Sequence, residues 1–130
     1  MPREYFKGTW QEDRSFSPVG ATRGGRTLWL AGVGAREDEE GNSLAGDFEG
    51  QVHATFKLIE KNLSRAGGTL QDIVTMTAFT LEVRYGDRFT ELRRQYFSGG
   101  YPGSALITVA GFAHPDMMLE IQAIAVVGDE

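Results

Sequence analysis

The strongest strand-like pattern of apolar positions lies in the last quarter of the chain, between residues 101 and 127. Two strands are predicted there, over residues 104–110 and 117–127, joined by a turn-forming segment that contains Pro115. Successive side chains of a strand point to opposite sides, so one face of the second strand is wholly apolar. Its other face holds Met118, Glu120, Gln122, Ile124 and Val126. A strand apolar on most of both faces predicts cover on both sides of the sheet.

Glu120 lies in this predicted central strand, with apolar neighbours on its own face. Carboxylates seldom occupy such a position without a partner or a function. Two structural roles are open: an ion pair with Arg84 or Arg88, or a hydrogen bond to a stray backbone amide. We favour a third role, in which Glu120 serves a functional site. Gln122, two residues further along the same face, would then orient a water or a carbonyl group beside it.

Two helices are predicted upstream of this strand pair. Asp47 is a suitable N-cap, and apolar residues recur every three or four positions from residue 48 to residue 66, where a glycine pair ends the helix. Asp87 is expected to cap a second, shorter helix that runs through Phe97. The first helix is the most strongly patterned element of the chain.

Three further strands complete the pattern. Residues 15–19 predict a short edge strand, residues 27–33 a buried strand, and residues 73–81 a strand in which threonines alternate with apolar residues. Gly32 inside the second of these indicates a bulge, or a close approach by another backbone or a ligand. Residues 1–14 are polar without a clear period and predict a loosely attached arm.

The order of elements predicts a single α+β domain over residues 1–130, with two helices on one face of a mixed sheet. Two helices cover only one face of such a sheet. Because its strands are apolar on both faces, the second face should be covered by another copy of the chain.

Composition narrows the functional classes. The chain has 41% hydrophobic and 24% charged residues, as an ordinary globular domain does. A net charge of −5 argues against a nucleic-acid partner, which usually requires a basic surface. The absence of cysteine excludes disulfides, thiol nucleophiles and thiolate metal sites. Without a signal peptide or a membrane-spanning stretch, we expect a cytoplasmic protein with no membrane partner.

No familiar cofactor motif is present. His53 and His114 are not accompanied by acidic residues at metal-ligand spacing, so neither a metal nor another cofactor is expected. The acidic run at residues 37–42 is interpreted as a solvated loop. Arg93 and Arg94 have the charge to hold an anion, but a solvated helix face is the favoured interpretation.

Four segments, taken in order and with their spacing, resemble the Rid family of reactive intermediate deaminases, also called the YjgF family. These segments are Leu28-Trp29-Leu30-Ala31-Gly32, Gly46-Asp47-Phe48-Glu49-Gly50-Gln51, Val74-Thr75-Met76-Thr77-Ala78-Phe79 and Leu119-Glu120-Ile121-Gln122-Ala123-Ile124-Ala125-Val126. The resemblance runs from about residue 15 to residue 127. It implies a chorismate-mutase-like α+β fold and a homotrimer, in which sheets line a central barrel, helices lie outside, and sites occupy the clefts between subunits.

The resemblance also implies an activity. The best-known members hydrolyse enamines and imines, such as 2-aminoacrylate and its imine tautomer, to a 2-oxo acid and ammonia. In them an arginine binds the substrate carboxylate, and a glutamate near the C-terminus positions or activates the attacking water. That glutamate corresponds to Glu120, and a glycine of the site corresponds to Gly32.

Other positions depart from the family pattern. The family's arginine falls on Ser104, its N-terminal tyrosine on Val19, a serine on Ala31, and an asparagine on Thr90. Three more residues complete the expected substrate-binding set: Ala105, Leu106 and Gln122. A bidentate arginine–carboxylate pair is strong and specific, so its loss predicts poor activity on simple 2-imino acids.

Two hypotheses follow. In the first, the protein is a deaminase-type hydrolase of altered specificity that uses Glu120 to activate water on a small metabolite. In the second, it is a non-catalytic trimer that binds a small metabolite or a protein partner. Ribonuclease activity, sometimes attached to the family, is disfavoured by the net charge of −5 and the lack of a basic patch.

Overall fold

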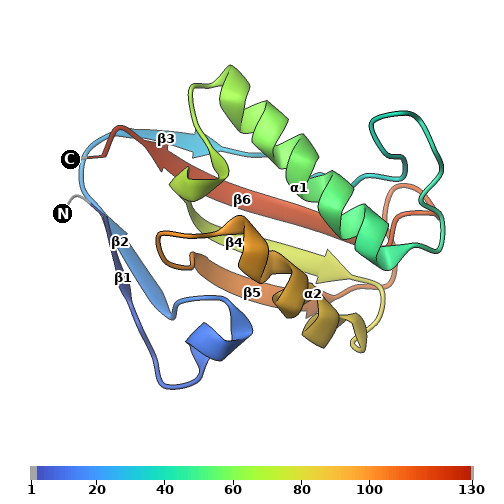
Figure 1. The fold of residues 1–130 in the computed structure, drawn as a ribbon, viewed down its shortest axis with the longest axis horizontal. Coiled ribbons are helices and arrows are strands. Elements are labelled where there is room, and N and C mark those ends of the chain that lie inside the picture. Colours follow the sequence, from blue (N-terminus) through green and yellow to red (C-terminus); the bar gives the residue numbers. More distant parts are fainter. Residues whose placement is uncertain (1–2, 130) are drawn as a thin grey trace.

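Residues 3–129, the part of the chain that the computed structural model describes, form a four-stranded sheet, a two-stranded sheet and two α-helices (Figure 1). The strands are β1 (Arg3–Phe6), β2 (Val19–Thr22), β3 (Arg26–Trp29), β4 (Ile73–Thr80), β5 (Gly103–Thr108) and β6 (Leu119–Val127). The helices are α1 (Phe48–Arg65) and α2 (Tyr85–Arg93), with short 3-10 helices at Gln11–Arg14, Leu70–Asp72 and Arg94–Tyr96. Residues 1, 2 and 130 lie outside this description.

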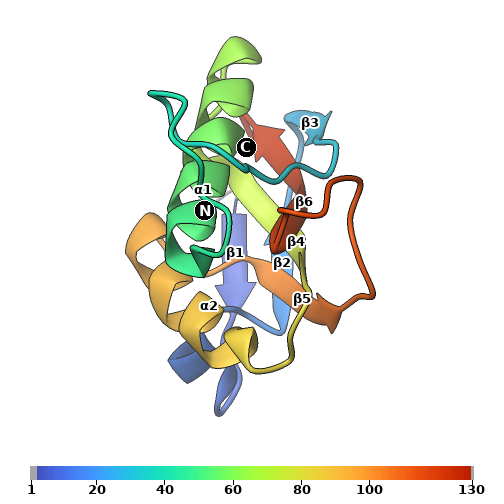
Figure 2. The same cartoon turned by 90° about the vertical axis from the view of Figure 1, so that its right-hand side faces the viewer.

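The larger sheet has the order β3-β6-β4-β5. β6 is antiparallel to both of its neighbours, whereas β4 and β5 are parallel and are connected through α2. Both helices lie on the same side of this sheet (Figure 2). The prediction of an α+β chain with a mixed sheet, two helices on one face and Glu120 in a central strand is therefore confirmed.

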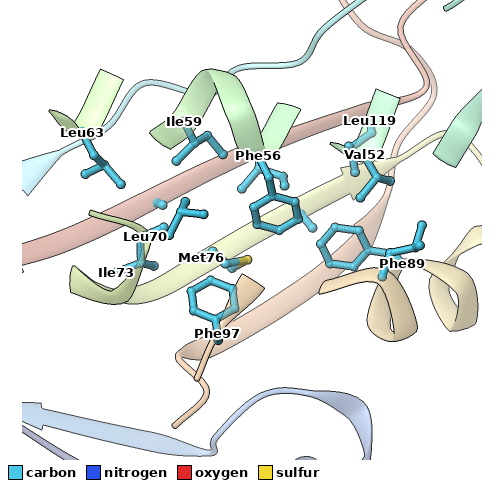
Figure 3. Packing of buried hydrophobic residues seen from close by; sticks show 14 of the residues in the cluster. Val52, Phe56, Ile59, Leu63, Leu70, Ile73, Met76, Phe89, Phe97 and Leu119 are labelled. Atoms are coloured by element: carbon cyan, nitrogen blue, oxygen red, sulfur yellow. The ribbon is translucent and has the colours of Figure 1, made fainter. Parts of the chain in front are cut away.

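The hydrophobic core fills the space between the helices and the sheet (Figure 3). The stripe of α1 supplies Val52, Phe56, Ile59 and Leu63, each at most 1% exposed. Burying one such side chain stabilises the fold by about 1.5–3 kcal/mol. The N-cap prediction is confirmed as well, because the Gly50 amide donates a 2.9 Å hydrogen bond to the Asp47 carboxylate.

The N-terminal segment differs from the loose arm expected from its sequence. Within residues 3–14, β1 pairs with β2, and a 3-10 helix follows. The Arg3 guanidinium donates hydrogen bonds to the carbonyls of Gln71 (2.7 Å) and Val126 (2.6 Å). It also donates to the Asp129 carboxylate at 3.2 Å. The partners of Arg3 lie in segments distant in the sequence, so the local sequence pattern could not predict that this segment is ordered.

Several element boundaries also differ from the prediction, two of them around Ser15 and α2. The strand expected over residues 15–19 is instead β2, and Ser15 is buried in a left-handed conformation with φ of 59°. Its hydroxyl donates a 2.7 Å hydrogen bond to the Thr90 carbonyl, which fixes it under α2. α2 begins at Tyr85, so Asp87 lies in its first turn and is not the cap.

Arg93 does not lie on a solvated helix face, because its side chain is turned inward and the residue is 1% exposed. Its guanidinium donates hydrogen bonds to the hydroxyls of Ser15 (3.0 Å) and Ser104 (2.5 Å) and to the Arg14 carbonyl (2.9 Å). Burial, with added repulsion from Arg14 and Arg94, lowers the pKa of Arg93 to about 10. The side chain is therefore still charged at neutral pH, and it fastens the N-terminal segment to α2 and β5.

β3 ends at Trp29, but the Leu30 amide still donates a 3.1 Å hydrogen bond to the Ala123 carbonyl of β6, and the next contact with β6 is at Val33. Val33 and Ile121 exchange backbone hydrogen bonds of 2.9 and 2.8 Å, while Ala31 and Gly32 lie in the interruption between the two contacts. Immediately afterwards Gly34 passes so close to β6 that a Cβ atom there would lie 2.2 Å from the Leu119 carbonyl oxygen. The predicted irregularity at Gly32 is confirmed.

The sheet face away from the helices, the open face, is uncovered by residues 3–129. It includes exposed apolar side chains, Trp29 at 76% and Ile107 at 44%, together with threonines of β4. A monomeric domain seldom leaves such side chains together in water.

Gly34→Ala should destabilise the fold, because the new methyl group would meet a backbone carbonyl that cannot rotate away. We expect the free energy of unfolding, measured by urea denaturation, to fall by at least about 2 kcal/mol. Gly111→Ala is the control, since nothing lies within 4 Å of its added Cβ. Equal stability of the two variants would contradict the close approach of Gly34 to β6.

Candidate functional site

Glu120 lies on the open face of β6, opposite Phe79 of β4, and is half-buried. A Cβ atom at Gly32 would lie 2.6 Å from Glu120 Oε2. Any side chain at residue 32 would therefore displace the carboxylate, and glycine is the residue that leaves room for it. The close approach at Gly32 is thus by the Glu120 side chain, and not by another backbone or a ligand as the sequence indicated.

Within residues 3–129 the Glu120 carboxylate has no ion pair and no hydrogen-bond donor. The two arginines considered as structural partners are engaged elsewhere: Arg84 contacts Glu82 at 3.3 Å, and Arg88 contacts Glu49 at 2.7 Å and also binds Glu91. The structural-ion-pair interpretation is wrong for this protomer. A half-buried carboxylate normally has a hydrogen-bond donor, which here would come from water, a ligand or another subunit.

Ser104 lies on the opposite face of the same sheet. It is in register with Met76, whose side chain enters the core, and its hydroxyl accepts the hydrogen bond from Arg93 described above. Thr90 joins the same cluster, because its carbonyl accepts from Ser15 and the Ser15 hydroxyl accepts from Arg93. Every acceptor that Arg93 binds is neutral. Within residues 3–129 its positive charge has no carboxylate partner.

The remaining expected site residues lie near Glu120, near Ser104, or apart from both. Gln122 and Ala105 are on the open face, where Gln122 lines a shallow cleft of about 280 Å³ beside Trp29. Leu106 is on the helix side at 38% exposure, next to Gly86 of α2. Ala31 is exposed beside Gly32, and Val19 is 54% exposed on β2.

The sheet therefore separates the expected site into two halves. We call Glu120, Gly32 and Gln122 the acidic half, and Arg93, Ser104 and Thr90 the basic half. Their side chains or backbones lie on opposite faces of one sheet, with the backbone of the sheet between them. One protomer cannot present both halves to a single small molecule.

Arg93 is the residue that sequence reasoning missed as part of this arrangement. A signal was present, because Arg93 follows Phe89 by four residues and side chains at that spacing share one face of a helix. Phe89 is fully buried, and the Arg93 guanidinium carbon lies 5.0 Å from its ring centroid. The helical stripe thus places Arg93 inward.

Other chemistry has little support in the part of the chain that the structure describes. His53 hydrogen-bonds the Tyr96 hydroxyl, as an ordinary structural histidine does. Among residues 3–129 no group of three His, Cys, Asp or Glu side chains is arranged to hold a metal ion. The helices in this range are all too short or too polar to cross a membrane.

Comparisons with known sequences agree on one family. The family model described as endoribonuclease L-PSP matches residues 12–127. A RutC family protein of Pyrococcus horikoshii is 26% identical over 112 residues, covering 83% of this chain and 88% of the relative. Human 2-iminobutanoate/2-iminopropanoate deaminase is 23% identical over 103 residues, covering 79% of this chain and 74% of the relative.

Solved structures show the same fold. A Rid-family protein of unknown function from Yersinia pestis superposes with a TM-score of 0.85 at 21% identity, covering 98% of this chain and all of the other. RidA from an Antarctic Psychrobacter has a TM-score of 0.71 at 24% identity, covering 87% and 89% of the two chains. The chain therefore belongs to the endoribonuclease L-PSP family, which includes the Rid (YjgF) proteins, and has their chorismate-mutase-like α+β fold.

Proposed function

We propose that the protein is a deaminase-type hydrolase that acts on a small metabolite in a cleft between copies of the chain. The observation that carries this proposal is the Glu120 carboxylate, which lies against Gly32 without a donor or cation from residues 3–129. A carboxylate in this condition is free to hold a water molecule and accept its proton. The name of the human relative, an imino-acid deaminase, supports the reaction class.

The proposed reaction is the hydrolysis of a C=N bond. Water held by Glu120 attacks the imine carbon and gives its proton to the carboxylate, while the electron pair of the C=N bond moves to nitrogen. The nitrogen is then protonated, the remaining C–N bond breaks, and ammonia leaves as the hydroxyl proton is lost. The products are a carbonyl compound and ammonia, so one water molecule is consumed per turnover.

The division of the site by the sheet supports a shared cleft. In a homotrimer the open face of one copy would be covered by its neighbours, which also removes Trp29 and Ile107 from water. The acidic half of one copy would then meet the basic half of the next. Such an assembly brings Glu120 of one copy near Ser104 of the next, where a substrate would feel the positive charge of the buried Arg93 without touching it.

The basic half indicates why the specificity would be altered. The guanidinium of Arg93 uses three of its N–H groups on protein acceptors, so it is not a free bidentate clamp. Its charge can attract an anionic or electron-rich group near Ser104, but without the geometric match of a paired carboxylate. A substrate larger or less charged than a simple 2-imino acid fits this arrangement better.

The family description names an endoribonuclease, but we do not propose that activity for this chain. Its net charge of −5 opposes binding to a phosphate backbone. Two basic residues, Arg3 and Arg88, are moreover paired with carboxylates.

Glu120→Gln tests the proposed role of the carboxylate. Imines generated in situ from a panel of amino acids provide the assay, with the appearance of the carbonyl product as the readout. Wild-type protein should accelerate hydrolysis of at least one larger or less charged imine more than that of the 2-aminoacrylate imine. Glu120→Gln should lower that rate about 100-fold or more, because a neutral amide cannot accept the proton.

The melting temperature of Glu120→Gln should stay close to the wild-type value, since the carboxylate makes no structural bond. Glu60→Gln on the exposed surface of α1 is the matched control and should keep full activity. Unchanged hydrolysis by Glu120→Gln would refute the proposal. A wild-type protein that binds imines or their analogues without accelerating hydrolysis would favour the non-catalytic alternative.

Ser104→Arg restores the family's arginine but should not by itself restore activity on 2-aminoacrylate imines. Arg93 already lies 2.5 Å from the Ser104 hydroxyl, so a second guanidinium there meets like charge. We expect better hydrolysis from the double variant Ser104→Arg/Arg93→Met than from Ser104→Arg alone. A single variant as active as the double one would show that Arg93 does not oppose the added charge.

A further inference from the structure

We propose that a second cleft, on the N-terminal side of the molecule, binds a zwitterionic amino acid with an aromatic side chain. This aromatic cleft has a volume of about 260 Å³ and is lined by residues of the segment from β1 to Ser17 and of the loop from Phe97 to Tyr101. Pockets for drug-sized ligands span about 300–1,000 Å³, so this volume suits a molecule the size of one amino acid.

Aromatic side chains form one part of the walls of the cleft. Tyr5, Phe16, Phe97 and Tyr101 all line it. On the outside of Phe16, Trp10 packs edge-on with ring centroids 5.7 Å apart. Walls of this kind favour a flat, apolar group, which gains both buried area and ring–ring contacts.

Opposite charges at the cleft define the other part of the ligand. Lys7 and Glu12 both line it, with the Lys7 ammonium 3.2 Å from the Glu12 carboxylate. Their side chains are 70% and 53% exposed, so this ion pair contributes little to stability and is easily exchanged for contacts with a ligand. A carboxylate alone would satisfy Lys7 and be repelled by Glu12. A zwitterion satisfies both residues.

The cleft is held in shape before any ligand binds. Arg94 lies over the Tyr101 ring at 5.5 Å and donates hydrogen bonds to the Tyr101 hydroxyl (3.0 Å) and the Asp13 carbonyl (2.6 Å). Arg94 thus joins the two sides of the cleft. Gly100 has a positive φ of 117°, and a Cβ there would lie 2.7 Å from the Tyr5 ring. Walls fixed in this way lose little conformational entropy when a ligand enters.

The aromatic cleft shares no residue with the acidic or basic half of the proposed hydrolase site. Its occupant is therefore proposed independently of the reaction catalysed elsewhere. Binding at the cleft should be unchanged in Glu120→Gln, which separates failure of this proposal from failure of the proposed function.

Trp10 provides the reporter for the test. The chain has two tryptophans, so the Trp29→Phe variant leaves Trp10 as the only one, next to Phe16. Its fluorescence is titrated with L-phenylalanine, 3-phenylpropanoate, which lacks the ammonium group, and 2-phenylethylamine, which lacks the carboxylate. Calorimetry on the wild-type protein supplies the dissociation constants. We expect loss of either charged group from the ligand to raise the dissociation constant about fivefold or more.

Protein variants then assign each charge to its partner. Glu12→Gln should bring the affinity for L-phenylalanine down to that for 3-phenylpropanoate and leave 3-phenylpropanoate binding no weaker. Lys7→Met should bring the affinity for L-phenylalanine down to that for 2-phenylethylamine and leave 2-phenylethylamine binding no weaker. Lys57→Met and Glu60→Gln, exposed on α1 away from the cleft, are the matched controls and should bind as wild type.

Three outcomes would overturn the proposal. The first is no binding of L-phenylalanine at millimolar concentration. The second is equal affinity for L-phenylalanine and 3-phenylpropanoate, which would make the ligand a simple aromatic acid. The third is binding unaffected by Lys7→Met and Glu12→Gln, which would place the ligand elsewhere.

Discussion

The pairing register of β6 with its two neighbours determines both the core and the site. It directs Leu119, Ile121, Ala123 and Ala125 toward the helices and leaves Glu120 on the open face. A slip of one residue would exchange the two faces, removing four apolar side chains from the core and forcing the carboxylate under α1. The hydrophobic gain that fixes this register is therefore also what holds Glu120 in place beside Gly32.

A second constraint comes from the buried cation on the other side of the sheet. Arg93 is held by hydroxyl and carbonyl oxygens and not by a carboxylate, so its charge is retained at the cost of desolvation. The same side chain joins the N-terminal segment to α2 and β5. Among residues 3–129, the positive charge of Arg93, beside Ser104, and the negative charge of Glu120 both lack an ion-pair partner. The sheet keeps the two apart within a protomer.

The sequence pattern predicted the elements whose own residues carry a clear period of apolar positions. The stripe and cap of α1, the faces of β6, and the close approach at Gly32 could all be read from the sequence. β1 could not, because it is formed by pairing with β2 and is anchored by hydrogen bonds from Arg3 to carbonyls more than 60 positions away. The inward turn of Arg93 was discounted because a charged residue on a helix usually faces water. Its spacing of four residues from the buried Phe89 instead predicts that Arg93 lies on the inward face of the helix.

The shared cleft is tested most directly by chemical cross-linking between copies. The chain has no cysteine, so thiols introduced by substitution react without competition. Glu120→Cys and Ser104→Cys proteins are refolded together and treated with a short bifunctional thiol reagent. Covalent dimers should form in the mixture and not in either variant alone, with Glu60→Cys in place of Ser104→Cys as the control. An assembled mixture that yields no more dimer than the separate variants would contradict a site built from two copies.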